Sequence, residues 1–262
     1  TATVRLLRSD EIFNVLIVCP RGLVLNWYSE INKFYPNLTT TVVLPDVKTA
    51  PYTWERAKNS SSITITSYDQ VRLHSRLIGD GYDLVLLDEA HKLRNYRSST
   101  SKASRHLKSK YTWMLTGTPF EKSVRDYATL LSILEPSLYL ANNTNVDEIK
   151  LMSSDLILRR NKIDVLKELP EVIENDIKLE LTDEQKNSIN EIEKTSDIFI
   201  VKLKKMLQTC DYDLLTKKSC KIEYTINLIN NISMLGEKVI VFSYTIEPLN
   251  ILKNLLAESG VT

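Results

Sequence analysis

The feature that most constrains the fold is a series of short apolar runs separated by helical stretches. The two most apolar runs, Val15–Cys19 and Tyr82–Leu87, are nearly uninterrupted rather than alternating with polar residues. Strands that are buried on both faces of a parallel sheet have this pattern. Further strands are expected at 39–44, 62–66 and 112–115, and helices at about 51–58, 68–78, 99–107 and 123–134. The alternation predicts an α/β fold, with a parallel sheet wrapped by helices on both faces.

The segment that follows the first apolar run is expected to be helical. Leu25, Ile31 and Phe34 are its expected inward positions.

The pattern changes in the last third of the chain. Residues 172–181 alternate in polarity and predict a more exposed strand. Thr182 and Gln185 have the spacing of a helix cap with a capping box, and a long helical stretch should follow to about Leu207. A helix at about 219–234, a buried strand at 238–242 and a helix at 246–256 complete the pattern. We place a domain boundary near 160–172, giving domains 1–165 and 166–262.

The composition excludes several classes of protein. The formal net charge of the 262 residues is +1, so any nucleic-acid surface must be a local pattern rather than a global basic field. The three cysteines have no metal-site spacing, which makes a structural zinc site unexpected and favours a reducing compartment. No apolar run approaches the ~20 residues of a membrane helix, and no signal peptide opens the chain. We therefore expect no membrane association.

The strongest chemical signal is the tetrapeptide Asp88-Glu89-Ala90-His91, directly after the apolar run that ends at Leu87. In open α/β sheets, ligands bind beyond the carboxyl ends of the strands. There, Asp88 could hold Mg²⁺, with waters kept between them, and Glu89 could orient or deprotonate an attacking water. His91 would sense the bound nucleotide. The alternative is an ordinary acidic loop or helix cap after a strand.

A second signal, Thr116-Gly117-Thr118, stands at the end of the following predicted strand. Its glycine allows a close backbone turn, and its hydroxyls could hydrogen-bond to His91. The loop could then move when a phosphate leaves. The alternative is a simple strand-to-helix turn, with Thr118 as the helix cap.

Together with these two motifs, several further blocks in the same order resemble the ATPase core of the Swi/Snf-type branch of the superfamily-two helicases. Each block is similar to one of that family's named motifs. The blocks are Leu16–Pro20 with Leu25-Asn-Trp27 and Glu30 (motif Ia), Ile65–Tyr68 (Ib), Asp88–Asn95 (extended motif II, a DEAH box), Leu115–Pro119 (III), Leu158–Arg160 with Lys162 and Leu169-Pro170 (the segment that leaves the first lobe), and Lys238–Ser243 (IV). The resemblance covers nearly the whole chain.

The resemblance implies a fold and a set of ligands. It implies a RecA-like first lobe at 1–165, and then a linker, a helical protrusion and the beginning of a second RecA-like lobe at 166–262. ATP and Mg²⁺ are the implied cofactors, and double-stranded DNA, bound without sequence preference, is the implied partner. A protein displaced from DNA is a possible further target.

The resemblance also suggests which residues bind DNA or act between lobes. Arg21, Gly22, Ser67 and Tyr68 stand where the family holds the phosphate backbone of one strand. The alternatives are a helix cap for Ser67 and a packed ring for Tyr68. Arg159 and Arg160 have the position of functional or interlobe arginines. The alternative for this pair is an ion-paired set at a domain edge.

Two of the family's features are missing and one is altered. No GxxxxGK[ST] phosphate loop is present, and we expect it upstream of Thr1. The distal motifs of the second lobe, including its arginine finger, are also missing, so we expect this stretch alone to have little or no ATPase activity. Glu121 and Lys122 replace the family's usual Gln-Asn, which weakens the case for phosphate contact at that loop.

Three hypotheses follow. The leading one is an ATP-dependent translocase on double-stranded DNA. A strand-separating helicase or a nuclease-associated motor is the second, and a nucleic-acid-binding scaffold without hydrolysis is the third. The short segment 136–158 favours a bacterial, archaeal or phage protein, hence cytoplasmic, whereas a eukaryotic one would be nuclear.

Overall fold

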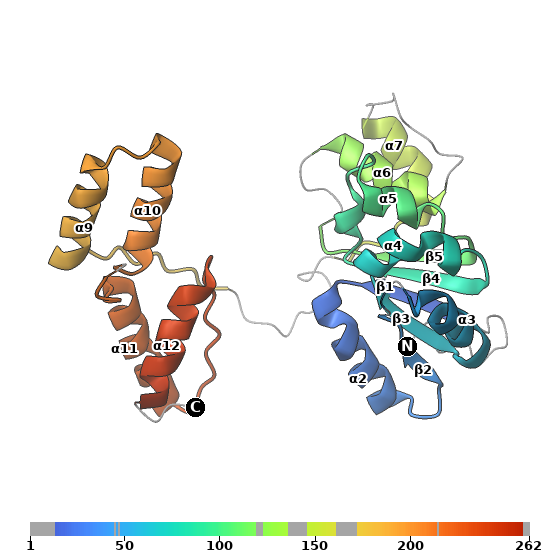
Figure 1. Ribbon diagram of the computed structural model, residues 1–262, viewed down its shortest axis with the longest axis horizontal. Coiled ribbons are helices and arrows are strands. Elements are labelled where there is room, and N and C mark those ends of the chain that lie inside the picture. Colours follow the sequence, from blue (N-terminus) through green and yellow to red (C-terminus); the bar gives the residue numbers. More distant parts are fainter. Residues whose placement is uncertain are drawn as a thin grey trace. The chain divides into compact units, whose positions relative to one another are not determined.

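The computed structural model describes residues 14–44, 46, 48–118, 123–135, 146–160, 172–213 and 215–258. The chain forms two compact units, unit 1 (Thr1–Val165) and unit 2 (Leu166–Thr262), which are drawn in Figure 1. In the ranges just given, no helix combines the length and the hydropathy that crossing a membrane requires.

Within its described residues, unit 1 contains a sheet of five parallel strands in the order β2-β3-β1-β4-β5. The strands are β1 (Val15–Cys19), β2 (Thr40–Val42), β3 (Ile63–Ser67), β4 (Tyr82–Asp88) and β5 (Ser109–Leu115). The predicted parallel sheet is confirmed, and β5 begins earlier than the sequence indicates.

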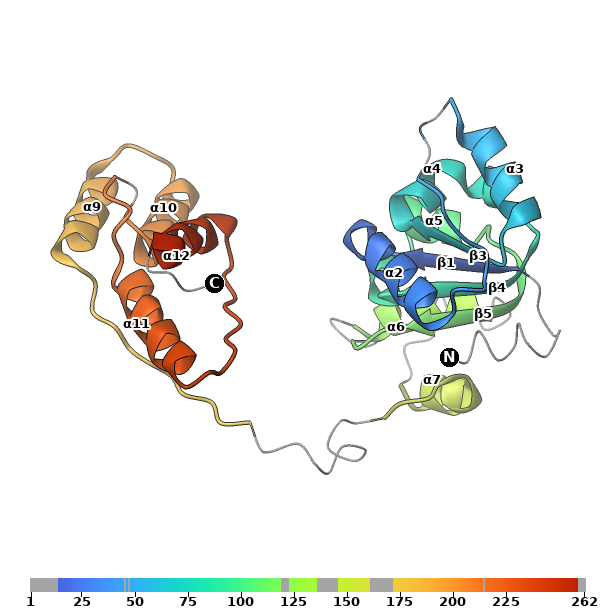
Figure 2. The same ribbon diagram turned by 90° about the horizontal axis from the view of Figure 1, so that it is seen from below.

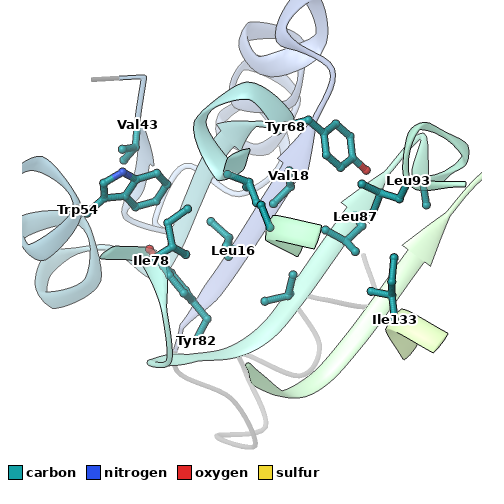
Figure 3. Packing of buried hydrophobic residues seen from close by; sticks show 14 of the residues in the cluster. Leu16, Val18, Val43, Trp54, Tyr68, Ile78, Tyr82, Leu87, Leu93 and Ile133 are labelled. Carbon is teal, nitrogen blue, oxygen red and sulfur yellow. The ribbon is translucent and has the colours of Figure 1, made fainter. Parts of the chain in front are cut away.

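Helices cover both faces of this sheet, as Figure 2 shows from below. In chain order, the described helices of unit 1 are η1 (Arg21–Leu23), α2 (Val24–Phe34), α3 (Ala50–Ser60), α4 (Tyr68–Ile78), η2 (Ala90–Leu93), α5 (Ser99–Ser104), α6 (Val124–Leu134), α7 (Val146–Ser153) and η4 (Ser154–Leu156). Successive residues of β1 point to opposite faces. Leu16 and Val18 pack with α3, α4, α5 and α6 (Figure 3), whereas Val15, Ile17 and Cys19 pack against α2.

Helix α2 corrects one prediction about its inward face. Ile31 is buried as expected, but Leu25 and Phe34 are 69% and 62% exposed. The stripe that packs on the sheet consists of Val24, Trp27 and Ile31, at spacings of three and four residues. Leu25 lies one residue, or about 100°, around the helix from this stripe and therefore faces solvent.

The order of the strands creates a switch point between β1 and β4. These strands are neighbours, but the chain leaves β1 toward α2 on one face and leaves β4 toward α5 on the other face. Ligands of open α/β sheets bind at such a point, outside the carboxyl ends of the strands. The fold therefore predicts a ligand site near the residues that follow Cys19 and Leu87.

The described residues of unit 2 contain four helices: α9 (Asp183–Lys194), α10 (Phe199–Asp211), α11 (Cys220–Met234) and α12 (Ile246–Glu258). The predicted capping box is confirmed, because the Thr182 side chain accepts from the Gln185 N–H and the Gln185 side chain accepts from the Thr182 N–H. The predicted single helical stretch to Leu207 is wrong. It divides between α9 and α10, where Thr195 and Asp197 hydrogen-bond locally and compete with the helical backbone.

Two strands predicted in unit 2 are also wrong. Residues 172–181 and 238–242 form no strand in the described structure. Ile240 and Phe242 are 79% and 89% exposed rather than buried. A strand needs a neighbour to satisfy its backbone groups, and no other described segment of unit 2 pairs with either stretch. The β-branched and apolar composition of these two segments is therefore not sufficient to form a strand.

Asp213 gives unit 2 a predicted sensitivity to acid. Burial by itself raises the pKa of Asp213, but hydrogen bonds from Ser188, Thr216 and the Leu215 N–H outweigh it and lower the pKa below its ordinary value. A carboxyl group with a lowered folded-state pKa stabilises the fold above its unfolded pKa of about 4, and that contribution is lost as the pH falls through the folded value.

We therefore expect Asp213→Asn to flatten the loss of stability below about pH 4. Urea denaturation followed by circular dichroism at pH 6 and pH 3 measures the change. Glu191→Gln, an exposed carboxyl change in α9, is the control and should follow the unsubstituted protein. An equal acid sensitivity in the Asp213→Asn variant would show that this carboxylate does not control the transition.

Candidate active site

Asp88 is the last residue of β4, at the carboxyl edge of the sheet. It lies opposite Leu115, the last residue of β5, and its predecessor Leu87 is almost completely buried. Asp88 itself is half-buried. The apolar run therefore ends where the strand emerges from the core, which places the carboxylate at the edge predicted from the sequence.

Three donors from three parts of unit 1 hold Asp88. The indole N–H of Trp27 donates to its carboxylate oxygen Oδ2 over 2.8 Å, and the Glu89 N–H donates to Oδ1 over 3.0 Å. The Tyr68 hydroxyl donates to its backbone carbonyl over 2.6 Å. Each carboxylate oxygen has lone pairs beyond the one that these bonds use. Asp88 is thus fixed in orientation and still able to bind a cation or ordered water.

Glu89 has a left-handed backbone conformation, with φ 51° and ψ 48°. This region costs a residue other than glycine about 1–2 kcal/mol and is enriched at functional sites. The turn aims the Glu89 N–H back at Asp88, and Oε2 of Glu89 lies 3.1 Å from Nδ1 of His91. Because the Glu89 side chain is 42% exposed, it can reach water and solvent-borne ligands.

Thr116 connects β5 to this group. Its Oγ1 lies 3.5 Å from His91 Nδ1, a long contact, and it accepts from the Thr118 N–H over 3.2 Å. The structure thus brings the loop after β5 next to His91. Gly117 and Thr118 are exposed in the same loop. The cap of α6 is Ser123, so Thr118 does not cap that helix.

The residues expected to contact nucleic acid lie in two different settings. Arg21 and Gly22 form the exposed turn η1 directly after β1, at the same sheet edge as Asp88. Ser67 is 2% exposed and stands at the N-cap position of α4, without a side-chain capping bond. The Tyr68 ring is 6% exposed and packs beside Val18 and Leu87 (Figure 3).

For Tyr68 the structure therefore shows the packed ring that the sequence left as an alternative. Its hydroxyl is engaged by the Asp88 carbonyl, so a phosphate contact through that hydroxyl does not fit this geometry. Ser67 presents no exposed hydroxyl surface, and only its place at the start of α4 keeps it near the sheet edge.

Other predicted residues remain apart from this group or lie outside the described residues. Arg159 and Arg160 are exposed after η4, and neither forms an ion pair with another residue that the structure describes. Pro119, Glu121 and Lys122 lie outside the described residues, so the altered positions after the Thr116 loop are not placed.

Trp27 is the site residue that sequence reasoning missed. The motif Ia resemblance includes Trp27 but gives it no task, and its ring packs on the α2 face of the sheet. Its indole N–H, however, reaches the carboxylate at the end of β4. A partly buried tryptophan usually finds an acceptor for its N–H, and this was the available signal.

Two groups near Asp88, the Cys19 thiol and the Tyr68 hydroxyl, stay protonated near neutral pH. Burial, and then the charge of Asp88, raises the pKa of the Cys19 thiol to about 12. Burial, with a smaller contribution from Asp88, also raises the pKa of the Tyr68 hydroxyl far above its ordinary value. Tyr68 therefore remains a hydrogen-bond donor to Asp88, and Cys19 does not act as a thiolate.

The residues present fit a magnesium site of the open type. Mg²⁺ in nucleotide enzymes is held by one or two carboxylates, with waters and phosphate oxygens completing its shell. Asp88 supplies such a carboxylate at the sheet edge, with Glu89 next to it. Within the described ranges, the structure shows no group of three or more His, Cys, Asp or Glu side chains that could hold a metal ion.

Comparison with known proteins decides the family. A model of the SNF2-related domain matches residues 5–225. The chain belongs to this family. The SNF2-related resemblance seen in the ordered motifs is therefore confirmed, and the five-stranded parallel sheet matches the RecA-like lobe of this ATPase core.

Two relatives illustrate the range of the family. An uncharacterized ATP-dependent helicase from Mycoplasma pneumoniae is 28% identical over 94% of this chain and 26% of its own length. The ISWI chromatin-remodeling complex ATPase ISW2 of Saccharomyces cerevisiae is 30% identical over 65% of this chain and 17% of its own. The chain thus spans about a quarter or less of the curated relatives that it matches.

A solved structure gives the same assignment. The Sulfolobus solfataricus SWI2/SNF2 ATPase core in complex with dsDNA has a TM-score of 0.56 and 26% identity, and the match covers 99% of this chain and 62% of that one. The names of these relatives describe an ATP-dependent helicase, a chromatin-remodeling ATPase and an ATPase core.

Proposed function

We propose that the full-length protein is an ATP-dependent translocase that moves along double-stranded DNA and remodels or displaces bound protein. The observation that carries this proposal is the joining of Asp88, Glu89, His91 and Thr116 at the switch point of the sheet. The likeness to a SWI2/SNF2 ATPase core solved with dsDNA supports duplex DNA as the partner.

Each residue of the group has a chemical task in this proposal. Bound Mg²⁺ would supply charge neutralisation for the ATP phosphates. Asp88 would hold that ion, through water, with the carboxylate orientation set by Trp27 and Glu89 N–H. Glu89 would orient the attacking water and take its proton, since its carboxylate is 42% exposed and His91 is its only side-chain partner among the residues that the structure describes.

His91 and Thr116 would pass the state of the nucleotide to the loop after β5. Nδ1 of His91 lies within reach of both Glu89 and Thr116. A shift of Glu89 on hydrolysis would therefore change the hydrogen bond between the imidazole and the Thr116 hydroxyl. Gly117 and Thr118 continue this loop, and their exposure leaves them free to move. This would couple chemistry to a change in the DNA-facing surface.

The proposed DNA contacts are backbone contacts. Arg21 can form a charge-assisted bond to a phosphate, and the Gly22 backbone can approach closely because no atom stands within 4 Å of a Cβ placed there. Ser67 would contribute through the start of α4. Such contacts grip the duplex without reading its sequence.

We further propose the family's lobe assignment. Residues 1–165 form the first RecA-like lobe, and 166–262 supply a linker, the helical protrusion of α9 and α10 and the beginning of the second lobe. Arg159 and Arg160 leave the first lobe and would act between lobes.

The test is ATP hydrolysis by the full-length protein, with and without blunt duplex DNA. We expect duplex DNA to stimulate turnover and the double variant Asp88→Asn, Glu89→Gln to abolish it. Turnover that duplex DNA leaves unchanged would contradict a DNA-dependent motor. Inactivity with every nucleic acid would instead favour a binding scaffold.

A further inference from the structure

Trp27 and Asp88 form a side-chain contact between α2 and the end of β4. The indole N–H of Trp27 lies 2.8 Å from Oδ2 of Asp88, a short distance for an N–H donor and typical of a charge-assisted bond. The Trp27 ring is packed on the α2 face of the sheet with Ile31 and Trp113, which restricts its two side-chain torsions. Trp27 is therefore a donor held in one place by the core.

The Trp27 N–H helps to fix the orientation of the Asp88 carboxylate plane. The Glu89 N–H occupies one site on Oδ1, and the Trp27 N–H occupies one site on Oδ2. With both oxygens so engaged, the carboxylate plane is defined, and the remaining lone pairs point in fixed directions. If the Trp27 bond is removed, the carboxylate can rotate about its last torsion, which is soft in aspartate.

The position of Trp27 along the chain connects this carboxylate to the exposed turn η1 at the same sheet edge. The exposed turn η1, with Arg21 and Gly22, runs directly into α2. Trp27 stands about one helical turn beyond Leu23, the last residue of η1. A ligand that binds η1 and displaces it would therefore also displace the first turn of α2. Trp27 is the side chain of that turn that contacts Asp88.

We propose that Trp27 is a positioning residue for the Asp88 carboxylate, and that it makes α2 the link between the Arg21–Gly22 turn and the cation site. This inference rests on the proposed function, because it assigns Mg²⁺ to Asp88. Trp27 touches neither the substrate nor the cation in this role. A tryptophan that only packs in the core would need only its ring. Removal of the indole N–H with the ring kept therefore distinguishes positioning of Asp88 from packing.

The contact itself is tested by nuclear magnetic resonance on this chain labelled with ¹⁵N. Trp27, Trp54 and Trp113 give three indole N–H signals. Asp88→Ala should move the Trp27 signal and leave the Trp54 and Trp113 signals in place. A Trp27 signal that does not respond to Asp88→Ala would overturn the proposal, whatever the protein's activity.

The consequence is tested by Mg²⁺ titration of nucleotide binding in the full-length protein, followed with a fluorescent ATP analogue. Trp27→Phe keeps a packed ring and removes the donor. We expect it to raise the Mg²⁺ concentration for half-maximal binding about tenfold, the usual cost of losing a hydrogen-bond partner of a metal ligand. Binding in EDTA should be unchanged. Trp113→Phe, in the same cluster, should stay within about twofold.

The link is tested in the same titration by adding duplex DNA. DNA should lower the required Mg²⁺ concentration in the unsubstituted protein and leave the Trp27→Phe variant unaffected. If Trp27→Phe titrates like the unsubstituted protein, the inference fails and the proposed function stands. If the unsubstituted protein shows no Mg²⁺-dependent nucleotide binding, both fail.

Discussion

Glu89→Gln is expected to lower kcat for ATP hydrolysis by the full-length protein about 10²–10⁴-fold. Glutamine has nearly the same shape but cannot take a proton from water, and general-base catalysis contributes this range of rate. The left-handed backbone at Glu89 should persist, because it is set by the turn between β4 and η2. Steady-state hydrolysis with saturating duplex DNA measures the change.

Binding should survive this substitution. We expect the affinities for nucleotide and for duplex DNA to stay within about twofold, since Asp88 and the η1 turn are untouched. Glu55→Gln, an exposed glutamate of α3, is the matched control and should leave kcat unchanged. If Glu89→Gln retains a third or more of the activity, Glu89 is not the base and the proton must be accepted elsewhere.

The second large effect is expected in unit 2, where Gln185 is completely buried. Its side-chain amide donates to the carbonyls of Thr209 and Cys210, and its oxygen accepts from the N–H groups of Thr182 and Cys220. It thus joins the start of α9, the end of α10 and the start of α11. Truncation would leave buried backbone groups without partners.

We expect Gln185→Ala to lower the free energy of unfolding of unit 2 by about 3 kcal/mol. The loss combines a capping box, worth about 1 kcal/mol, with unsatisfied buried groups at about 1–3 kcal/mol. Urea denaturation followed by far-ultraviolet circular dichroism measures it. Asn187→Ala removes an exposed amide two residues along the same helix and should cost under 1 kcal/mol. Equal midpoints for the two variants would contradict this role for Gln185.

The strands of unit 1 could be predicted because parallel strands leave a strong local record. Val15–Cys19 is buried at every position, so both faces demand apolar side chains and the run has no polar interruption. The inward face of α2 could not be predicted in the same way. Val24 and Leu25 are equally apolar, and only the packing of α2 on the sheet selects Val24.

The strand predicted at 238–242 shows the limit of local preference. Its residues favour extended backbone, but a strand is stabilised by its neighbours, and sequence alone does not show whether a neighbour is present. The described part of unit 2 offers none, and Phe242 is exposed.

Some residues of the candidate site could likewise be predicted from the sequence, whereas others depend on the three-dimensional arrangement of the strands and helices. Asp88, Glu89 and His91 are adjacent in sequence and follow a strand, and Thr116 follows the next strand, so their meeting could be expected. The Trp27 contact depends on β1 lying beside β4, which becomes known only when the strand order is known. The packed ring of Tyr68 likewise depends on how α4 lies against the sheet.

The central claim is movement along duplex DNA, and displacement of a third strand tests it most directly. A labelled oligonucleotide is bound as a triplex on a blunt linear duplex, and its release by the full-length protein is followed with and without ATP. The account predicts ATP-dependent release with the duplex left intact, and no release by the Asp88→Asn, Glu89→Gln variant. ATP hydrolysis without release, or release only where the duplex strands separate, would contradict it.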